Sequence, residues 1–306
     1  MSAAQDVTAR PVAEPRTVER RRRPGKGFRE DWWRHVVGIV ACVFALFPVA
    51  YIVSAAFNDN DALSGAAVIP QNMTLHNFGQ ILHNADAPYV SWYLNTLWIA
   101  LVTATFTVLL GAMAAFAFSR FRFRGRRMGM LFLLLIQMFP QLLLIVAIYL
   151  IVLHTGDVFS TLGLNSRIAL VCVYLGGAMG VNTWLLKGFF DSIPSELDES
   201  ARVDGATAAQ VFWGVVLPLA APVLAVVGLF SFVFTVNEFI IASVLLSTQD
   251  KLPLLVGMRG YIDQQYGQHW GPFAAGVVLA SIPAVVLFAF LQRFIVGGLT
   301  QGSVKG

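Results

Sequence analysis

Long blocks of apolar residues constrain this chain more than any other feature of its sequence. Six blocks approach or exceed the roughly 20 residues that a helix needs to cross a bilayer, at 35–57, 89–118, 129–153, 168–186, 219–246 and 273–296. Because a bilayer offers backbone groups no water, each block is predicted to be a helix. Only 12% of the residues are charged, against about 25% in a soluble domain. The expected fold is an all-α integral membrane bundle of six transmembrane helices, over residues 35–306.

The positive charges predict how the chain is oriented. In a six-span topology, all but three of the 21 Lys and Arg residues lie on one side, the exceptions being Arg167, Lys251 and Arg259. Such an excess is typical of cytoplasmic loops, so both termini and the loop at 187–218 are expected in the cytoplasm. Residues 1–34 are predicted to be a disordered basic tail, which either only sets topology or also contacts anionic membrane lipid. This bias explains the positive charge without nucleic-acid binding, which is not expected.

Cysteines and nucleotide motifs exclude several classes of function. Cys42 and Cys172 both lie inside apolar blocks, so buried thiols are expected rather than a disulfide framework. No Cys and His cluster has zinc spacing, and no metal site is predicted. The chain also has no G-x-x-x-x-G-K-[ST] loop. We therefore expect no catalytic residues, no nucleotide hydrolysis and no cofactor bound by this chain.

One stretch, residues 194–218, mixes acids, a base and small residues between two apolar blocks. Ser195 is predicted to cap a helix, and Asp198 completes a capping-box-like pattern. Gly205 is predicted to interrupt that helix and permit a sharp turn. A second short helix is predicted over 206–216, because a proline follows it closely. The residues alone fit either a surface helix between two spans or a docking element whose small side chains let a partner approach.

Polar side chains inside the apolar blocks are the candidates for a transport path. Asn95 and Gln137 are interpreted as helix–helix hydrogen bonds, although a solvated path would also use such groups. Asn237 and Glu238 are the candidates for a translocation path, because burying a charge without water or a partner is costly. Pro140 predicts a kink in the third block, which serves either the passage of a solute or packing.

The spacing within 194–218 resembles the EAA loop of the membrane subunits of ABC importers. That pattern is Glu-Ala-Ala, three residues, Gly, nine residues, Ile-x-Leu-Pro, and this chain departs from it at Ser200 and Val215. The resemblance implies that the stretch is a coupling helix, which sits in a cleft of a cytoplasmic ATPase. The residues to which it assigns ATPase coupling are Glu199, Ser200, Ala201, Asp204, Gly205, Ala206 and Pro218.

Motifs in the second half resemble permeases of the MalG type, from maltose and maltodextrin importers. They include Asp204-Gly205-Ala206-Thr207, Val256-Gly257-Met258, Trp270-Gly271-Pro272 and the tail 298–306. The resemblance covers 89–306 and excludes the Arg-rich N-terminus. It implies that the tail enters an ATPase dimer interface, with contacts from Thr300, Gln301, Gly302 and Lys305. It also implies that the loop 247–271 reaches toward the sugar cleft of a binding protein, with contacts from Gly257, Tyr261 and Tyr266.

The resemblance implies a set of partners and a location. The partners are a second, MalF-like permease subunit, a dimer of MalK-like ATP-binding subunits that hold ATP and Mg, an extracytoplasmic sugar-binding protein and an oligosaccharide substrate. The location is a bacterial inner or plasma membrane. Two alternatives stay open. One is a permease for another sugar, such as trehalose. The other is a proton-coupled secondary transporter that uses Glu238, which the lack of a second half-repeat disfavours.

Overall fold

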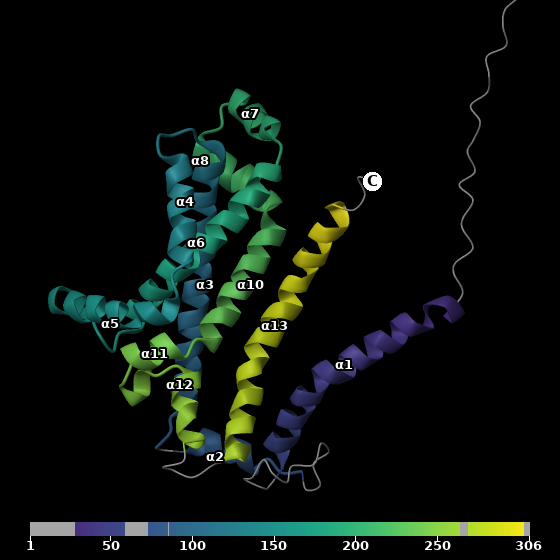
Figure 1. The fold of residues 1–306 in the computed structure, drawn as a ribbon, viewed down its shortest axis with the longest axis vertical. Coiled ribbons are helices and arrows are strands. Elements are labelled where there is room, and N and C mark those ends of the chain that lie inside the picture. The colour runs from purple at the N-terminus through teal and green to yellow at the C-terminus, as the bar shows by residue number, and fades with distance from the viewer. Residues whose placement is uncertain (1–27, 59–72, 85, 264–268, 303–306) are drawn as a thin grey trace, which may run out of the picture. The chain divides into compact units, whose positions relative to one another are not determined.

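The computed structural model describes residues 28–58, 73–84, 86–263 and 269–302, and most of them are helical (Figure 1). The chain divides into two units, residues 1–48 and 49–306. The division follows Pro48, which lies inside the helix α1 (Phe28–Phe57). The described part of the first unit is therefore the beginning of α1, and the remaining helices belong to the second unit.

The second unit is a bundle of helices. Its longer helices are α3 (Tyr89–Arg120), α4 (Arg126–Gln137), α5 (Gln141–Val158), α6 (Arg167–Ser192), α10 (Ala221–Asn237) and α13 (Trp270–Gly302). The shorter helices that join them are α2 (His76–His83), α7 (Ser195–Val203), α8 (Ala208–Val211), α9 (Leu217–Leu219), α11 (Ile240–Leu245) and α12 (Leu254–Met258). Single 3₁₀ turns occur at Ser160–Leu162, Gln249–Lys251 and Arg259–Tyr261, and a π-helical turn at Phe212–Val216.

Four helices are long and apolar enough to cross a membrane, and the number is six if each of two bent helix pairs forms one span. The four are Trp32–Phe57 within α1, α3, α6 and Trp270–Phe294 within α13. The pairs are α4 with Leu142–Val158, bent by 105°, and Ala208–Leu219 with α10, bent by 79°. The all-α membrane class is therefore confirmed, whereas the count of six spans stays a prediction.

Several helices extend beyond their predicted ends. α1 begins at Phe28, so residues 28–34 of the predicted disordered tail are helical, while residues 1–27 lie outside the described residues. α6 continues to Ser192, because Lys187 and Asp191 form an ion pair one helical turn apart. An apolar run predicts only the part of a helix that lies in lipid. The helix itself can continue into the polar residues on either side of that run.

The predicted fifth span, 219–246, is interrupted at Glu238. α10 ends at Asn237, and Glu238 is extended (φ −76°, ψ 120°) before α11 begins. The carboxylate of Glu238 accepts the backbone N–H groups of Ile241 at 2.8 Å and Ala242 at 3.0 Å. These are donors that the first turn of a helix leaves unpaired. A carboxylate favours such a site, so the apolar run breaks and restarts here.

The kink predicted at Pro140 is confirmed as a complete break. α4 ends at Gln137, and α5 begins after Pro140, whose backbone is extended (φ −61°, ψ 116°). Proline lacks the N–H that would continue the hydrogen-bond ladder of α4. The third apolar block therefore forms two helices that lie at a large angle to one another (Figure 1).

α3 packs against both α6 and α10 and lies beside them through the bundle (Figure 1). The face that it buries carries small residues, namely Ala100, Ala104, Gly111, Ala112 and Ala115. A Cβ atom on Gly111 would lie 3.4 Å from Cδ1 of Leu186 on α6. Small residues let membrane helices approach closely, so this stripe explains the central position of α3.

The prediction of buried thiols is wrong. Cys42 and Cys172 are free cysteines, and both are exposed on this chain. In a soluble protein an apolar run indicates burial, but the outer surface of a membrane helix is apolar as well. Hydrophobicity therefore does not distinguish a side chain inside the bundle from one on its surface.

Candidate functional site

The coupling loop, residues 187–218, bends at Gly205. Its φ of +86° lies in the left-handed region, which glycine adopts without a clash from Cβ. α8 follows, capped by Thr207. The Thr207 hydroxyl accepts the N–H of Gln210 at 3.3 Å, and the Gln210 side chain accepts the N–H of Thr207 at 2.8 Å. The predicted form, a helix, a glycine turn and a second helix, is confirmed.

Asp198 anchors α7 to the bundle instead of capping it. Its Oδ2 lies 2.5 Å from Nε of Arg120, and the two side chains are only 5% and 9% exposed. Nη2 of Arg120 also donates to the carbonyl of Ile193 at 3.0 Å, where α6 gives way to α7. Ser195 is the first helical residue of α7, and Pro194 before it makes no side-chain cap. The predicted capping box is therefore wrong, because a charge partner on another helix holds the carboxylate.

Pro218 does not end the second helix of the loop, which corrects that prediction. α8 passes into the π-helical turn Phe212–Val216 and then into α9, where Pro218 occupies the first turn. Proline removes one backbone hydrogen bond of this continuous helical path, yet the helix passes through it and ends at Leu219. The chain turns after Pro218, at Ala220, whose φ is −86° and ψ is 0°.

Most residues with a predicted coupling role are exposed. The exposed ones are Glu199, Ser200, Asp204, Gly205 and Pro218. Ala201 and Ala206 are half-buried and pack on a core cluster below the loop. This cluster includes Phe116 of α3 and Phe212 of the π-helical turn, whose ring centroids lie 5.2 Å apart. The loop therefore offers an outer face to a partner while its inner face is fixed to the bundle.

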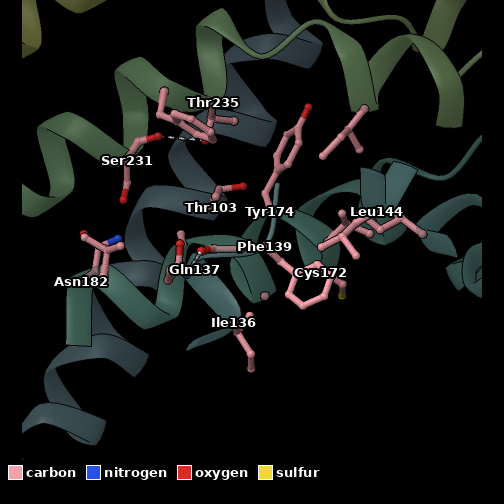
Figure 2. Close-up of a pocket in the computed structure, with 18 of the residues that line it drawn as sticks. Thr103, Ile136, Gln137, Phe139, Leu144, Cys172, Tyr174, Asn182, Ser231 and Thr235 are labelled. Atoms are coloured by element: carbon pink, nitrogen blue, oxygen red, sulfur yellow. Dashed lines mark hydrogen bonds between the residues drawn. The ribbon is translucent and has the colours of Figure 1, made fainter. Parts of the chain in front are cut away.

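A cavity of about 750 Å³ lies among α3, α4, α5, α6, α10 and α11 (Figure 2). Its wall is mainly apolar and includes the rings of Phe139, Phe230 and Phe234. Its few polar side chains include Gln137, which donates to the carbonyl of Gly177 at 2.7 Å. The amide of Asn182 and the hydroxyls of Thr103 and Ser231 also line the cavity (Figure 2), and these groups could bind a polar ligand there.

Asn237 and Glu238 lie beside this cavity rather than in its wall. The hydroxyl of Tyr174, which lines the cavity, donates to Oε2 of Glu238 at 2.5 Å. Nδ2 of Asn237 donates to the carbonyl of Val233 at 2.8 Å within α10. Both side chains thus have structural bonds, and their predicted place on a translocation path stays a prediction. The described residues contain no group of three or more His, Cys, Asp or Glu that would hold a metal ion.

Asn95 and Gln137 both make hydrogen bonds to other segments, as predicted, although Gln137 also lines the cavity. Nδ2 of Asn95 donates to the carbonyls of Asp250 at 2.8 Å and Leu252 at 3.1 Å. Its Oδ1 accepts a hydrogen bond from Nη1 of Arg167 at 2.5 Å. Gln137 joins α4 to α6 through its bond with the Gly177 carbonyl.

The α11–α13 loop, residues 246–269, is packed onto the end of α3. A Cβ atom on Gly257 would lie 2.2 Å from Cδ2 of Trp92, and Tyr261 is 8% exposed. Tyr266 lies outside the described residues. The predicted contact of Gly257, Tyr261 and Tyr266 with a binding protein stays a prediction. Arg259, which lies between Gly257 and Tyr261 in the sequence, is exposed.

Sequence reasoning missed the residues that hold this loop. Nε1 of Trp92 donates to the carbonyl of Gln249 at 2.7 Å, and Oγ1 of Thr96 accepts the N–H of Leu254 at 2.7 Å. The sequence could have indicated these residues, because Trp92, Asn95 and Thr96 have the spacing of residues on one face of a helix. Arg120 was also missed, but its partner Asp198 lies far away in the sequence and no local pattern connects them.

Asn165 holds the same loop from the other side. It has a positive φ of 59°, which Asn tolerates better than most residues. Its Oδ1 accepts from the N–H of Ser247 at 2.7 Å, the hydroxyl of Ser247 at 3.0 Å and the N–H of Thr248 at 3.0 Å. Its own N–H donates to the carbonyl of Leu245 at 2.9 Å.

The C-terminal residues form part of α13, which continues to Gly302. Thr300 and Gln301 are therefore helical, whereas the sequence suggested a short glycine-rich tail after residue 296. Lys305 lies outside the described residues. The contact of this segment with an ATPase stays a prediction.

Comparisons with known proteins agree with this arrangement. The family described as binding-protein-dependent transport system inner membrane component matches residues 107–301. The maltose/maltodextrin transport system permease protein MalG of Vibrio parahaemolyticus is 37% identical over 286 residues, covering 90% of this chain and 96% of the relative. The galactooligosaccharides transport system permease protein GanQ of Bacillus subtilis is 36% identical over 265 residues, covering 86% and 92%.

A solved structure also resembles the chain along most of its length. It is the crystal structure of a bacterial ABC transporter involved in the import of the acidic polysaccharide alginate, and one of its chains matches with a TM-score of 0.72 and 25% identity. The match covers 87% of this chain and 97% of that one. The chain belongs to the family of inner membrane permease components of binding-protein-dependent transport systems.

Proposed function

We propose that this chain is one of two permease subunits of an ATP-driven importer of maltodextrin-like oligosaccharides. Relatives named for maltose, maltodextrin and galactooligosaccharide transport support the sugar class, since they are 36–37% identical over most of the chain. The partners are a second, MalF-like permease, two MalK-like ATP-binding subunits and an extracytoplasmic sugar-binding protein. ATP and Mg are bound by the ATP-binding subunits, and this chain performs no chemistry.

The observation that carries this proposal is the bent, outward-facing coupling loop on a packed bundle. Glu199, Ser200 and Asp204 are exposed and lie near the left-handed turn at Gly205. Small and polar side chains let the loop enter a cleft of an ATP-binding subunit. When that subunit moves, the loop moves with it, and the helices attached to it turn as rigid bodies.

The cavity in Figure 2 is the proposed share of this chain in the translocation path. Its volume of about 750 Å³ falls within the usual range of ligand sites. The rings of Phe139, Phe230 and Phe234 suit the apolar faces of sugar rings, and Asn182 suits a hydroxyl. Tyr174 connects this wall to Glu238, so the acid shapes the path without entering it.

The positive charges support the orientation of the proposed assembly. With the termini and the coupling loop in the cytoplasm, the α11–α13 loop faces the binding protein. In this arrangement the helix that contains Thr300, Gln301 and Gly302 also lies on the side of the ATP-binding subunits, which it is proposed to contact.

The test replaces Gly205 with valine in the complete transporter, reconstituted in proteoliposomes with its binding protein. A residue with Cβ at positive φ costs about 1–2 kcal/mol, and no described atom lies within 4 Å of the new Cβ. The change therefore strains the backbone at the bend without a clash against other parts of the chain. We expect ATP-driven maltodextrin uptake to fall about tenfold or more while the chain still inserts and assembles.

Gly79→Val in α2 is the matched control, since that site is also open but has no positive φ. Normal uptake by Gly205→Val would count strongly against the coupling role. A wild-type transporter that imports no maltodextrin in the presence of ATP would overturn the sugar class. Uptake by this chain alone, driven by a proton gradient, would instead favour the secondary-transporter alternative.

A further inference from the structure

α3 is attached by side-chain bonds to both loops on which the proposed function depends. At one end, Arg120 forms the buried ion pair with Asp198 of α7 at 2.5 Å and donates to the carbonyl of Ile193 at 3.0 Å. A buried ion pair is a costly way to stabilise a fold, but it fixes one geometry, because removing either partner leaves an unpaired charge. The inner face of the coupling loop is thereby held to the last turn of α3.

The opposite end of α3 carries a second set of bonds, to the α11–α13 loop. Trp92 and Asn95 donate to backbone carbonyls of that loop at 2.7 and 2.8 Å, and Thr96 accepts an N–H at 2.7 Å. Asn95 also accepts from Arg167 at the start of α6, which ties the two neighbouring helices together there. α7 and α12 lie at opposite ends of the bundle in Figure 1, and α3 runs between them.

The helix between these ends is suited to transmit movement. α3 has 32 residues and no proline, and an α-helix of that length spans about 48 Å. α6, with 26 residues and no proline, is also continuous. The other long segments of the second unit are not, since α4 and α5 are separated at Pro140, α10 ends before Glu238, and α13 contains Pro283. The small-residue face of α3 packs closely on α6 and α10, and close packing transmits displacement.

We propose that α3 is the strut that couples binding-protein docking outside to the ATP-binding subunits inside. Arg120 and Asn95 are its positioning residues. This inference rests on the proposed function and adds a route to it. Docking that displaces the α11–α13 loop moves the outer end of α3, and the Arg120–Asp198 pair moves α7 with it. By reciprocity, closure of the ATP-binding subunits moves the outer loop.

The experiment uses the complete transporter in proteoliposomes with its binding protein and maltodextrin. Three quantities are measured: basal ATP hydrolysis, the stimulation of hydrolysis by the loaded binding protein, and sugar uptake. Arg120→Gln breaks the inner attachment and Asn95→Leu the outer one. The controls are Arg122→Gln, an exposed arginine in the next loop, and Ser91→Ala, a half-buried residue of α3.

We expect each of the two test variants to lower the stimulation about tenfold, while basal hydrolysis stays within about twofold of the controls. The double variant should lose no more than either single variant, because both interrupt one connection. Exchanging the charges, with Arg120→Asp and Asp198→Arg together, should recover much of the stimulation. A purely structural role would instead lower the yield of complex, and basal and stimulated hydrolysis would fall together.

Two results would overturn the strut. One is stimulation in either Arg120→Gln or Asn95→Leu that equals the controls, and the other is a pair of losses that multiply in the double variant. If Arg120→Gln fails to assemble, normal stimulation in Asn95→Leu is enough to overturn it. The wild-type transporter separates the two proposals. If the wild type takes up sugar and the variants keep normal stimulation, only the strut is rejected. If the wild type takes up no sugar, the proposed function is rejected.

Discussion

The coupling loop and the α11–α13 loop both join membrane helices, but they are held in opposite ways. The coupling loop exposes most of its residues. Its side-chain anchors lie near its start, where Asp198 pairs with Arg120 and Asp191 accepts from the hydroxyl of Ser119, and its inner face packs on a core cluster. The first part of the α11–α13 loop, residues 247–254, is bonded by Trp92, Asn95, Thr96 and Asn165. The first loop therefore presents an exposed outer face, whereas the second is fixed against α3 by side-chain hydrogen bonds.

The two loops differ in what determines their conformation. In the coupling loop the shape resides in the backbone, at the positive φ of Gly205 and the capped start of α8 at Thr207. In the α11–α13 loop it resides in side chains that belong to other parts of the chain. Single substitutions should therefore affect the two loops unequally, and four of them test this comparison in order of decreasing effect.

The largest effect is expected from Asp198→Ala. It leaves the guanidinium of Arg120 buried without its partner, which costs about 3 kcal/mol of folding free energy. The melting temperature of the detergent-solubilised complex should fall clearly, and Glu196→Ala, at an exposed site of the same helix, should leave it nearly unchanged. Equal melting temperatures for the two variants would show that the ion pair is not a main anchor of the coupling loop.

Gly257→Ala should have the next largest effect. The added Cβ would lie 2.2 Å from the ring of Trp92, so the loop must shift, at a cost of about 2 kcal/mol. The same melting assay measures it, with Gly260→Ala as the control, since no described atom lies within 4 Å of a Cβ there. If Gly257→Ala and Gly260→Ala have the same melting temperature, the α11–α13 loop is packed less tightly than its contacts indicate.

Asn165→Ala should cost about 1–2 kcal/mol. It removes an acceptor of three hydrogen bonds from Ser247 and Thr248. Because the site is exposed, water replaces part of this bonding, and each bond contributes only about 0.5 kcal/mol. Asn165→Asp keeps the acceptor and is the matched variant. Hydrogen exchange at the N–H groups of Ser247 and Thr248 should speed up in the alanine variant. Unchanged exchange would remove Asn165 from the set of anchors.

Thr207→Ala should have the smallest effect, about 1 kcal/mol. It removes the hydroxyl that caps α8, which is the usual cost of losing an N-cap. Thr207→Ser retains the hydroxyl and should melt like the wild type. A larger loss in Thr207→Ala than in Asp198→Ala would reverse the order and show that the capped turn, rather than the ion pair, fixes the coupling loop.

The helical class and the glycine turn were predictable because both depend on local chemistry. A bilayer forces apolar runs into helices, so α3 and α6 were expected near their observed positions. Gly205 was expected to adopt a turn, because glycine tolerates positive φ. Pro140 was expected to disturb its helix, because it removes a backbone donor.

What was not predictable depends on partners distant in the sequence. Asp198 looked like a capping residue because Ser195 precedes it by three positions, yet it pairs with Arg120 on α3. Glu238 looked like a charge within one continuous span, yet it starts a new helix by accepting two N–H groups. In neither case did the local pattern identify the partners of the carboxylate, and only the packed structure showed which groups it meets.

The exposure of Cys172 in the wall of the cavity has a practical consequence. The chain has two cysteines, so replacing Cys42 leaves a single native thiol as a reporter of the cavity. A thiol reagent that does not cross membranes, applied from one side at a time, would then record which compartment reaches this wall. Comparing the reactivity of Cys172 with and without ATP would then show whether the cavity changes the side of the membrane to which it opens during transport.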